Sequence, residues 1–277
     1  MATASEAGRA NSSGQPLDQL TASRVARDAW RFLRDHPRSL VTIGGFPFAL
    51  ALAFGVASRL AAGADLPAFP MEVADSALTV LPWTLFGVAW HRLVLVAGSS
   101  APSVSMTWSR SHTWFALFLL FWRVARVLTT GLLVLPDLPE TPDPTTLPEI
   151  GSGVMVASLA WLGLMVVGLY LQARLSLFLP AVAIGQPLSL RQSWAQSRHY
   201  TGVIFWGVVF GMVLGLLVTS PLFAASLYLT DRPSAVAQLI STVLSGGSSI
   251  VVMALAVGSL SFAYRAIGER RALPLVL

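Results

Sequence analysis

The stretch "LFLLFWRVARVLTTGLLVLP" (117–136) is an apolar run with two arginines, Arg123 and Arg126, near its middle. A hydrocarbon core about 30 Å thick requires roughly 20 apolar residues in a helix, so the run is long enough to cross a membrane. A charged residue at mid-membrane costs roughly 2.5–3.5 kcal/mol on insertion scales, and arginine does not shed its proton. The stretch therefore predicts a membrane-spanning helix whose two guanidinium groups require polar surroundings.

The composition of the whole chain also indicates a membrane protein. Of its 277 residues, 55% are hydrophobic and 11% are charged, and the mean hydropathy is +0.68. Soluble domains carry about 25% charged residues. The chain has no cysteine, which excludes a disulfide framework, a thiolate metal site and a cysteine nucleophile. The 18 basic residues are all arginines spread between apolar stretches, a pattern that favours membrane topology over nucleic-acid binding.

An all-α membrane domain with six spans is predicted over residues 18–277. The spans are residues 39–62, 76–97, 113–136, 153–178, 201–229 and 237–264. Residues 1–17 are small and polar and predict a disordered tail. Because no apolar segment and cleavage site precede the first span, we expect no removable signal peptide.

The charges between the spans predict the orientation of the chain. With the N-terminus inside, the cytoplasmic segments hold 14 arginines and five acids, whereas the opposite side holds two arginines and eight acids. Four of those acids lie in "DLPETPDPTTLPEI" (137–150). This asymmetry follows the positive-inside rule and predicts a multi-pass membrane protein with both termini in the cytoplasm.

An amphipathic helix is predicted at residues 20–36, directly before the first span. One face holds small and apolar residues with Trp30, and the other holds Arg24, Arg27, Arg31 and Arg34. Such a helix is expected to lie in the headgroup plane with its apolar face in the lipid and its arginines near lipid phosphates. Packing against a partner is the alternative for the apolar face.

The segments before the odd-numbered spans resemble one another. Each contains a tryptophan followed by an arginine and a histidine. They are Trp30, Arg34 and His36; Trp108, Arg110 and His112; and Trp194, Arg198 and His199. Each even-numbered span ends beside one arginine, at Arg92, Arg174 or Arg265. The pattern predicts three helical hairpins, each with an interfacial helix; the alternative is a shared boundary composition, because aromatic and basic residues are common at membrane interfaces.

The stretch "YLQARLSLFLPAVAIGQPLSLRQSWAQSRHYTG" (170–202) resembles a pattern of the YciC-like bacterial inner-membrane proteins, and is similar to the membrane domain attached to some glycerophosphodiester phosphodiesterases. The pattern is a span ending in Arg-Leu-Ser, then Leu-Pro-Ala, then a short polar helix with Ser-Trp. The matching residues are Arg174, Leu175, Ser176, Leu179, Pro180, Ala181, Ser193 and Trp194. "VAWHRLVLVAG" (88–98) also resembles a segment of these proteins. The resemblance implies a multi-span fold and an inner-membrane location.

The sequence contains no candidate catalytic or metal-binding motif, so no enzymatic activity, metal or cofactor is expected. The four histidines, at positions 36, 91, 112 and 199, fall at predicted membrane boundaries and are interpreted as headgroup contacts. Asp75, at the outer start of the second span, is the only acid near a span, which argues against ion-coupled transport.

The arginines carry the leading functional hypothesis. Their charge can be accommodated by snorkelling, by backbone and hydroxyl acceptors, or by an anion in a polar cavity. Arginine forks suit phosphate, so the hypothesis is that the protein binds or moves a phospholipid-like anionic amphiphile through an arginine-lined interior. The predicted ligand contacts are Arg123, Arg126, Arg92, Arg174 and Arg265, and the predicted interface residues are Arg24, Arg27, Trp30, Arg31, Arg34, Trp108 and Trp194. The alternative is a non-catalytic assembly or scaffold subunit with a protein partner in the membrane; an intramembrane enzyme ranks third.

Overall fold

The computed structural model describes residues 20–62, 68–96, 108–132, 152–186, 188–230, 232 and 234–272, and its regular secondary structure in these ranges is helical. The helices are α1 (Ala22–Asp35), α2 (Pro37–Ala62), α3 (Ala68–Leu95), α4 (Arg110–Leu132), α5 (Ser152–Leu175), α6 (Phe178–Ala183), α7 (Leu190–Ser197), α8 (Thr201–Thr230) and α9 (Ala235–Ala272). The prediction of an all-α fold is confirmed. The predicted tail at 1–17 lies outside the described residues.

Long helices occupy all six stretches that the hydropathy pattern predicted, and four contain segments long and apolar enough to cross a membrane. These segments are Pro37–Ala57, Leu78–Leu95, Thr201–Thr230 and Ala235–Glu269. They are expected of a multi-pass membrane protein. Helices α4 and α5 cover the predicted third and fourth spans, and the six-span topology stays a prediction.

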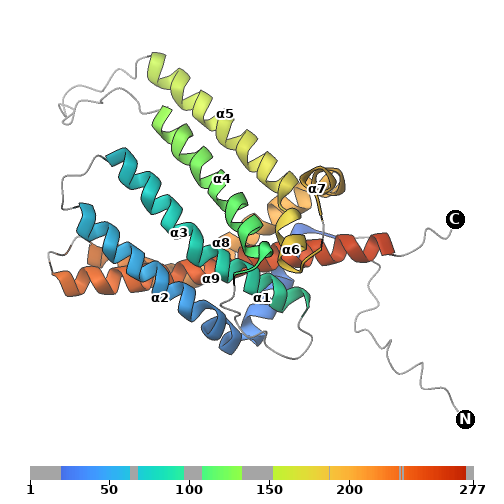
Figure 1. Cartoon of the computed structure of the whole chain (residues 1–277), viewed down its shortest axis with the longest axis horizontal. Helices are drawn as coiled ribbons and strands as arrows, with labels where there is room; N and C mark the ends of the chain where they lie inside the picture. The colour runs from blue at the N-terminus through green and yellow to red at the C-terminus, as the bar shows by residue number, and fades with distance from the viewer. Residues whose placement is uncertain are drawn as a thin grey trace, which may run out of the picture.

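The antiparallel pair α8 and α9 forms the centre of the molecule, and α1, α2, α3, α5 and α6 contact one or both of these helices (Figure 1). Helix α3 contacts α2, α4 and α9, while α5 contacts α7 and α8. The large apolar side chains of α8 that point away from α9 are exposed, including Trp206, Leu217 and Tyr228. An exposed apolar surface of this kind suits contact with lipid tails.

Glycines on α8 allow this central pair to pack closely. A Cβ atom on Gly215 would lie 2.9 Å from the Cα atom of Val252, and one on Gly211 would lie 3.0 Å from the carbonyl oxygen of Leu255. Both glycines are buried. The four-residue spacing of these small residues therefore serves backbone contact between helices.

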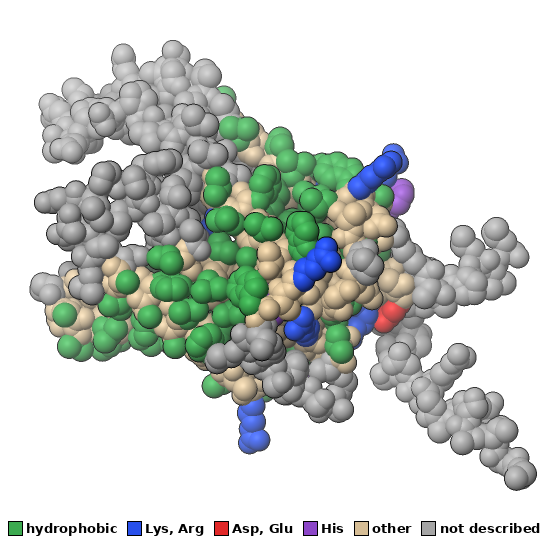
Figure 2. All heavy atoms as spheres, viewed as in Figure 1, with side chains coloured by type: hydrophobic (Ala, Val, Ile, Leu, Met, Phe, Trp, Pro, Cys, Tyr) green, Lys and Arg blue, Asp and Glu red, His purple; other side chains and the backbone are tan. Residues whose placement is uncertain are grey.

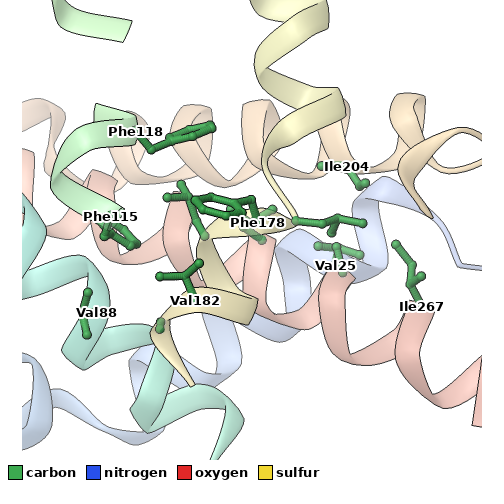
Figure 3. Close-up of a cluster of buried hydrophobic side chains, with 13 residues drawn as sticks. Val25, Val88, Phe115, Phe118, Phe178, Val182, Ile204 and Ile267 are labelled. Carbon is green, nitrogen blue, oxygen red and sulfur yellow. The ribbon is translucent and has the colours of Figure 1, made fainter. Parts of the chain in front are cut away.

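The hydrophobic core lies where the short helices meet the long ones. One cluster joins α1, α3, α4, α6, α8 and α9 through residues such as Val25, Val88, Phe115, Phe178 and Ile267 (Figure 3). A second cluster, around Phe86, Trp90 and Leu255, joins α1 and α3 to α9. Both clusters include residues of α1, so this short helix is built into the core.

Helix α1 forms where the sequence predicts an amphipathic helix, but its apolar face packs on protein. Thr21 caps its N-terminus by accepting a hydrogen bond from the Arg24 backbone N–H. Val25 lies against Gly207 of α8, and Ala29 lies against Gly258 of α9. The expectation that this face enters the lipid is therefore wrong, because α8 and α9 already remove it from water and lipid alike.

The predicted hairpin repeat is not confirmed. The first Trp-Arg-His segment runs from α1 to the residue that follows it, and the third spans α7 and the two residues after it. The second has no separate helix in the described part of the chain, since Trp108 precedes α4 and both Arg110 and His112 lie in the first turn of α4.

Candidate functional site

Arginines gather at one end of the bundle, called here the basic end. It comprises α1, α6 and α7 together with the starts of α2, α4 and α8 and the C-terminal ends of α3, α5 and α9. Figure 2 shows blue arginine side chains over this end, whereas the other end of the bundle is mainly apolar where it is coloured. The described arginines of the basic end are residues 24, 27, 31, 34, 38, 92, 110, 174, 191, 198 and 265.

Two of the predicted ligand arginines hydrogen-bond to the ends of neighbouring helices. The Nε atom of Arg92 donates to the carbonyl oxygen of Ala183, the last residue of α6, at 2.7 Å. Arg265 donates to the carbonyl oxygen of Val94, in the last turn of α3. Carbonyls in the last turn of a helix lack partners within the helix and carry partial negative charge. Both arginines therefore satisfy helix ends.

Arg174 is the most enclosed of the described arginines, with 5% of its surface exposed. Its guanidinium carbon lies 4.3 Å from the centroid of the Trp194 ring, and its Nη1 atom lies 3.5 Å from the Thr201 hydroxyl oxygen. Its Nε atom is buried and has no hydrogen-bond partner within the described part of the chain. A cation–π contact thus takes the place of a carboxylate partner.

The backbone around Arg174 is fixed by serines of α7. The hydroxyls of Ser193 and Ser197 both donate to the Arg174 carbonyl, at 3.4 and 2.7 Å. Ser189 begins α7 with a capping box that it forms with Gln192. In the segment that resembles the YciC-like proteins (170–202), α7 therefore packs against the C-terminal end of α5 and binds its last carbonyls.

The three predicted arginines that end the even-numbered spans do not surround a common described cavity. Arg265 lines a cavity near α1, Arg92 binds α6, and Arg174 lies under Trp194. Arg123 is half-buried on α4 and lines neither the cavity near α1 nor the one between α2, α3, α8 and α9. The side chain of Arg126 lies outside the described residues. An interior cavity at Arg123 and Arg126 stays a prediction.

The outer face of α1 presents two arginines without acidic partners. Arg24 pairs with Asp28 at 3.9 Å and Arg34 with Asp35 at 3.2 Å. Arg27 and Arg31 are exposed, lie one helical turn apart, and form no ion pair with any residue that the structure describes. Two like charges at this spacing repel each other, and an anion bound between them relieves the repulsion.

A cavity of about 120 Å³ opens between α1 and the end of α9. Its charged lining residues are Arg24, Asp28, Arg265 and Glu269, and its apolar ones include Val25 and Phe262. It therefore joins polar and apolar walls beside the arginine face of α1, a combination that suits the region between a lipid headgroup and its chains.

The predicted interface tryptophans differ in their surroundings. Trp108 is exposed, and its indole N–H donates to the Thr113 hydroxyl at 2.8 Å. Trp194 is partly exposed over Arg174. Trp30 is half-buried and packs against the cluster around Phe86 and Trp90. Trp108 and Trp194 thus keep exposed ring surface at the basic end.

Two histidines interpreted from the sequence as headgroup contacts are instead buried. His91 is fully buried, and its Nδ1 atom lies 2.7 Å from the Ser261 hydroxyl oxygen of α9. His112 has 3% exposure and contacts the Ser109 hydroxyl through Nδ1 at 2.7 Å. Sequence reasoning missed the His91–Ser261 pair because its members are 170 residues apart. His36 and His199 are exposed.

The described residues contain no group of three or more potential metal ligands.

Comparisons with protein-family models, with curated proteins and with solved structures find no match to this chain. The resemblance to the YciC-like proteins therefore stays a prediction, and function has to be inferred from the geometry of the chain itself.

Proposed function

We propose that this protein binds a phospholipid-like anionic amphiphile at its basic end, in the cytoplasmic leaflet of a bacterial inner membrane. The observation that carries the proposal is the exposed pair Arg27 and Arg31 on a helix whose opposite face is locked against α8 and α9. Lipid phosphate is the anion that a membrane supplies at headgroup level, and guanidinium groups bind it in a forked geometry.

Burial of the apolar face of α1 gives the arginine pair a defined position. A free amphipathic helix orders its arginines only when it enters the bilayer. Here Val25 and Ala29 already hold the helix on the bundle, so little further ordering is required when a headgroup binds. The neighbouring cavity, with Val25 and Phe262 in its wall, offers apolar surface to the start of a lipid chain.

The predicted interior arginines form the second part of the proposal. Arg123 and Arg126 lie on α4, away from α1, and would extend positive charge from the headgroup layer toward the membrane interior. An amphiphile that moves across the membrane would need such a path for its phosphate. The two parts of the proposal involve different residues and can be tested separately.

The test compares lipid binding by three double variants of the full chain in mild detergent, with dioleoyl phosphatidylglycerol as the probe and native mass spectrometry as the readout. Arg27→Gln with Arg31→Gln is expected to lower the affinity roughly tenfold or more, at about 1 kcal/mol for each arginine. Arg191→Gln with Arg198→Gln removes the same charge from exposed positions at the same end and is the matched control.

Equal losses in these two variants would show that only net charge matters and would refute the α1 site. Arg123→Leu with Arg126→Leu tests the interior path, which predicts a folded protein with less bound lipid. Unchanged lipid binding in all three variants would refute both proposed sites. Absence of lipid binding by the wild-type chain would refute lipid binding altogether and leave the assembly or scaffold hypothesis.

A further inference from the structure

A second cavity, of about 290 Å³, lies between α2, α3, α8 and α9 and has a different chemistry. Its lining includes Pro47 of α2, Pro82 of α3, Phe223 of α8 and Ser245 of α9. Ser245 precedes Arg265 by 20 residues on the same helix, which corresponds to about 30 Å at 1.5 Å per residue. This hydroxyl cavity is therefore separate from the basic end.

Hydroxyl groups provide the polar part of its wall. Six serines and threonines line it, all from α8 and α9: Ser226, Thr230, Ser241, Thr242, Ser245 and Ser249. The remaining wall is mostly apolar, with Phe48, Leu52 and Trp83 among its residues, and none of the lining residues that the structure describes is charged. The cavity therefore suits an uncharged group attached to an apolar body.

Most of these hydroxyls already donate their single proton. Ser226, Thr242 and Ser249 donate to backbone carbonyls of α8 and α9 at 2.8–2.9 Å. The hydroxyl oxygens of Thr230 and Ser241 lie 2.8 Å apart, and both lie 2.8–2.9 Å from the Ser226 carbonyl oxygen, so the protons of this pair are used within the group. A hydroxyl that donates to a carbonyl keeps lone pairs with which it can accept. These five side chains consequently offer acceptors to a ligand.

Among the six hydroxyls, that of Ser245 is still able to donate a hydrogen bond to a ligand. Its hydroxyl forms no hydrogen bond with any residue that the structure describes, although its carbonyl accepts one from Ser249 at 2.9 Å. One available donor among several acceptors matches an alcohol, which both donates and accepts. A phosphate or carboxylate, which only accepts when ionised, would meet mostly acceptors and no positive charge.

From this arrangement we infer that the hydroxyl cavity binds the free hydroxyl of an uncharged amphiphile of the acylglycerol type. The volume is near the lower end of ligand sites and holds the polar group with the first part of a chain.

The test uses the purified full chain with three short probes: dioctanoylglycerol, its acetyl ester, which has no free hydroxyl, and dioctanoyl phosphatidic acid. Native mass spectrometry measures the binding of each. Dioctanoylglycerol is expected to bind, and the ester to bind roughly tenfold more weakly because it cannot donate a hydrogen bond. Equal binding of the ester and the alcohol would overturn the inference.

Variants locate the binding. Ser245→Phe fills the cavity and is expected to abolish dioctanoylglycerol binding, whereas Ser220→Phe, at an exposed position on α8 outside the cavity, leaves it unchanged. Ser245→Phe should not affect phosphatidic acid, and Arg27→Gln with Arg31→Gln should weaken phosphatidic acid alone. Failure of this inference can thus be distinguished from failure of the lipid-phosphate proposal.

A milder pair of variants decides the outcome if Ser245→Phe does not fold. Ser245→Ala and Ser249→Ala are each expected to weaken dioctanoylglycerol binding roughly threefold to tenfold, while Ser248→Ala, a buried serine of α9 outside the cavity, does not. The inference is wrong if both lining variants bind as tightly as Ser248→Ala does.

Discussion

The side chain of Arg92 joins two helix ends, because its Nε atom donates to the carbonyl oxygen of Ala183 at 2.7 Å. The bond connects the end of α3 with the end of α6, across 91 residues of sequence. Arg265 makes the corresponding contact with Val94 at the end of α3 itself. Arginines that the sequence suggested as ligand contacts thus hold the basic end together.

The first prediction follows from this contact. Arg92→Leu leaves the Ala183 carbonyl without its donor, and we expect a loss of stability of about 1.5–3 kcal/mol, the range for hydrogen bonds to charged groups. Thermal unfolding in detergent measures the change. Arg191→Leu, at an exposed position on α7, is the control and should unfold as the wild type does. Equal effects of the two variants would contradict a structural role for Arg92.

The second prediction concerns the close contact between α8 and α9. A methyl group at Gly215 would lie 2.9 Å from the backbone of Val252, so Gly215→Ala must push the helices apart and should destabilise the protein by about 1–3 kcal/mol. Gly247→Ala adds a methyl group where no atom lies within 4 Å, and it should be neutral or slightly stabilising. Unfolding temperatures of the two variants test this contrast; similar temperatures would refute the close-packing role.

The third prediction concerns the buried pair His91 and Ser261. Ser261→Ala removes the partner of the buried His91 Nδ1 atom and should destabilise the protein by about 1–3 kcal/mol. His91→Leu removes one of the two partners of the Ser261 hydroxyl, which still donates to the Val257 carbonyl, and should have an effect at the lower end of that range. The double variant should lose less than the sum of the two, because neither polar group then remains without the other. A double-mutant cycle measured by thermal unfolding gives the coupling, and simple additivity would show that the pair contributes none.

The fourth prediction tests the orientation. Position 145 lies outside the described residues, in the acidic segment expected on the outer side. Thr145→Cys introduces a single thiol into a chain without cysteine. An impermeant thiol reagent should label it in cells whose outer membrane is permeabilised, and Ser23→Cys, before the first span, should remain unlabelled. Labelling at position 23 and none at position 145 would show that the topology is the reverse of the predicted one.

Several features of the fold could be predicted from local sequence because they depend on local physics. Apolar runs of spanning length predicted helices at six places, and all six carry long helices with nearby bounds. The alternation of arginines with small and apolar residues predicted α1, because the helical period alone separates the two faces. The concentration of arginines in the predicted cytoplasmic segments predicted that one end of the bundle would be rich in positive charge.

The partners of these residues could not be predicted, because they come from distant parts of the chain. Lipid tails and a protein interior are both apolar, so either one can surround an apolar side chain. The sequence therefore did not distinguish Val25 facing lipid from Val25 packed on Gly207. The sequence also did not distinguish a ligand contact from a helix-end donor at Arg92, because the carbonyl that it binds, on Ala183, is 91 residues away.

The sequence by itself determined the helices, their apolar character and the segregation of positive charge, because each follows from residue type and spacing along one chain segment. Only the tertiary structure decided which polar groups meet. The crossing of α8 and α9 with α2 and α3 gathers six hydroxyls around one cavity. At the basic end, away from that cavity, the packing of α1 on α8 and α9 leaves Arg27 and Arg31 exposed on the bundle surface. These contacts join residues of different helices, so they depend on how the helices pack and cannot be inferred from residue spacing within one segment.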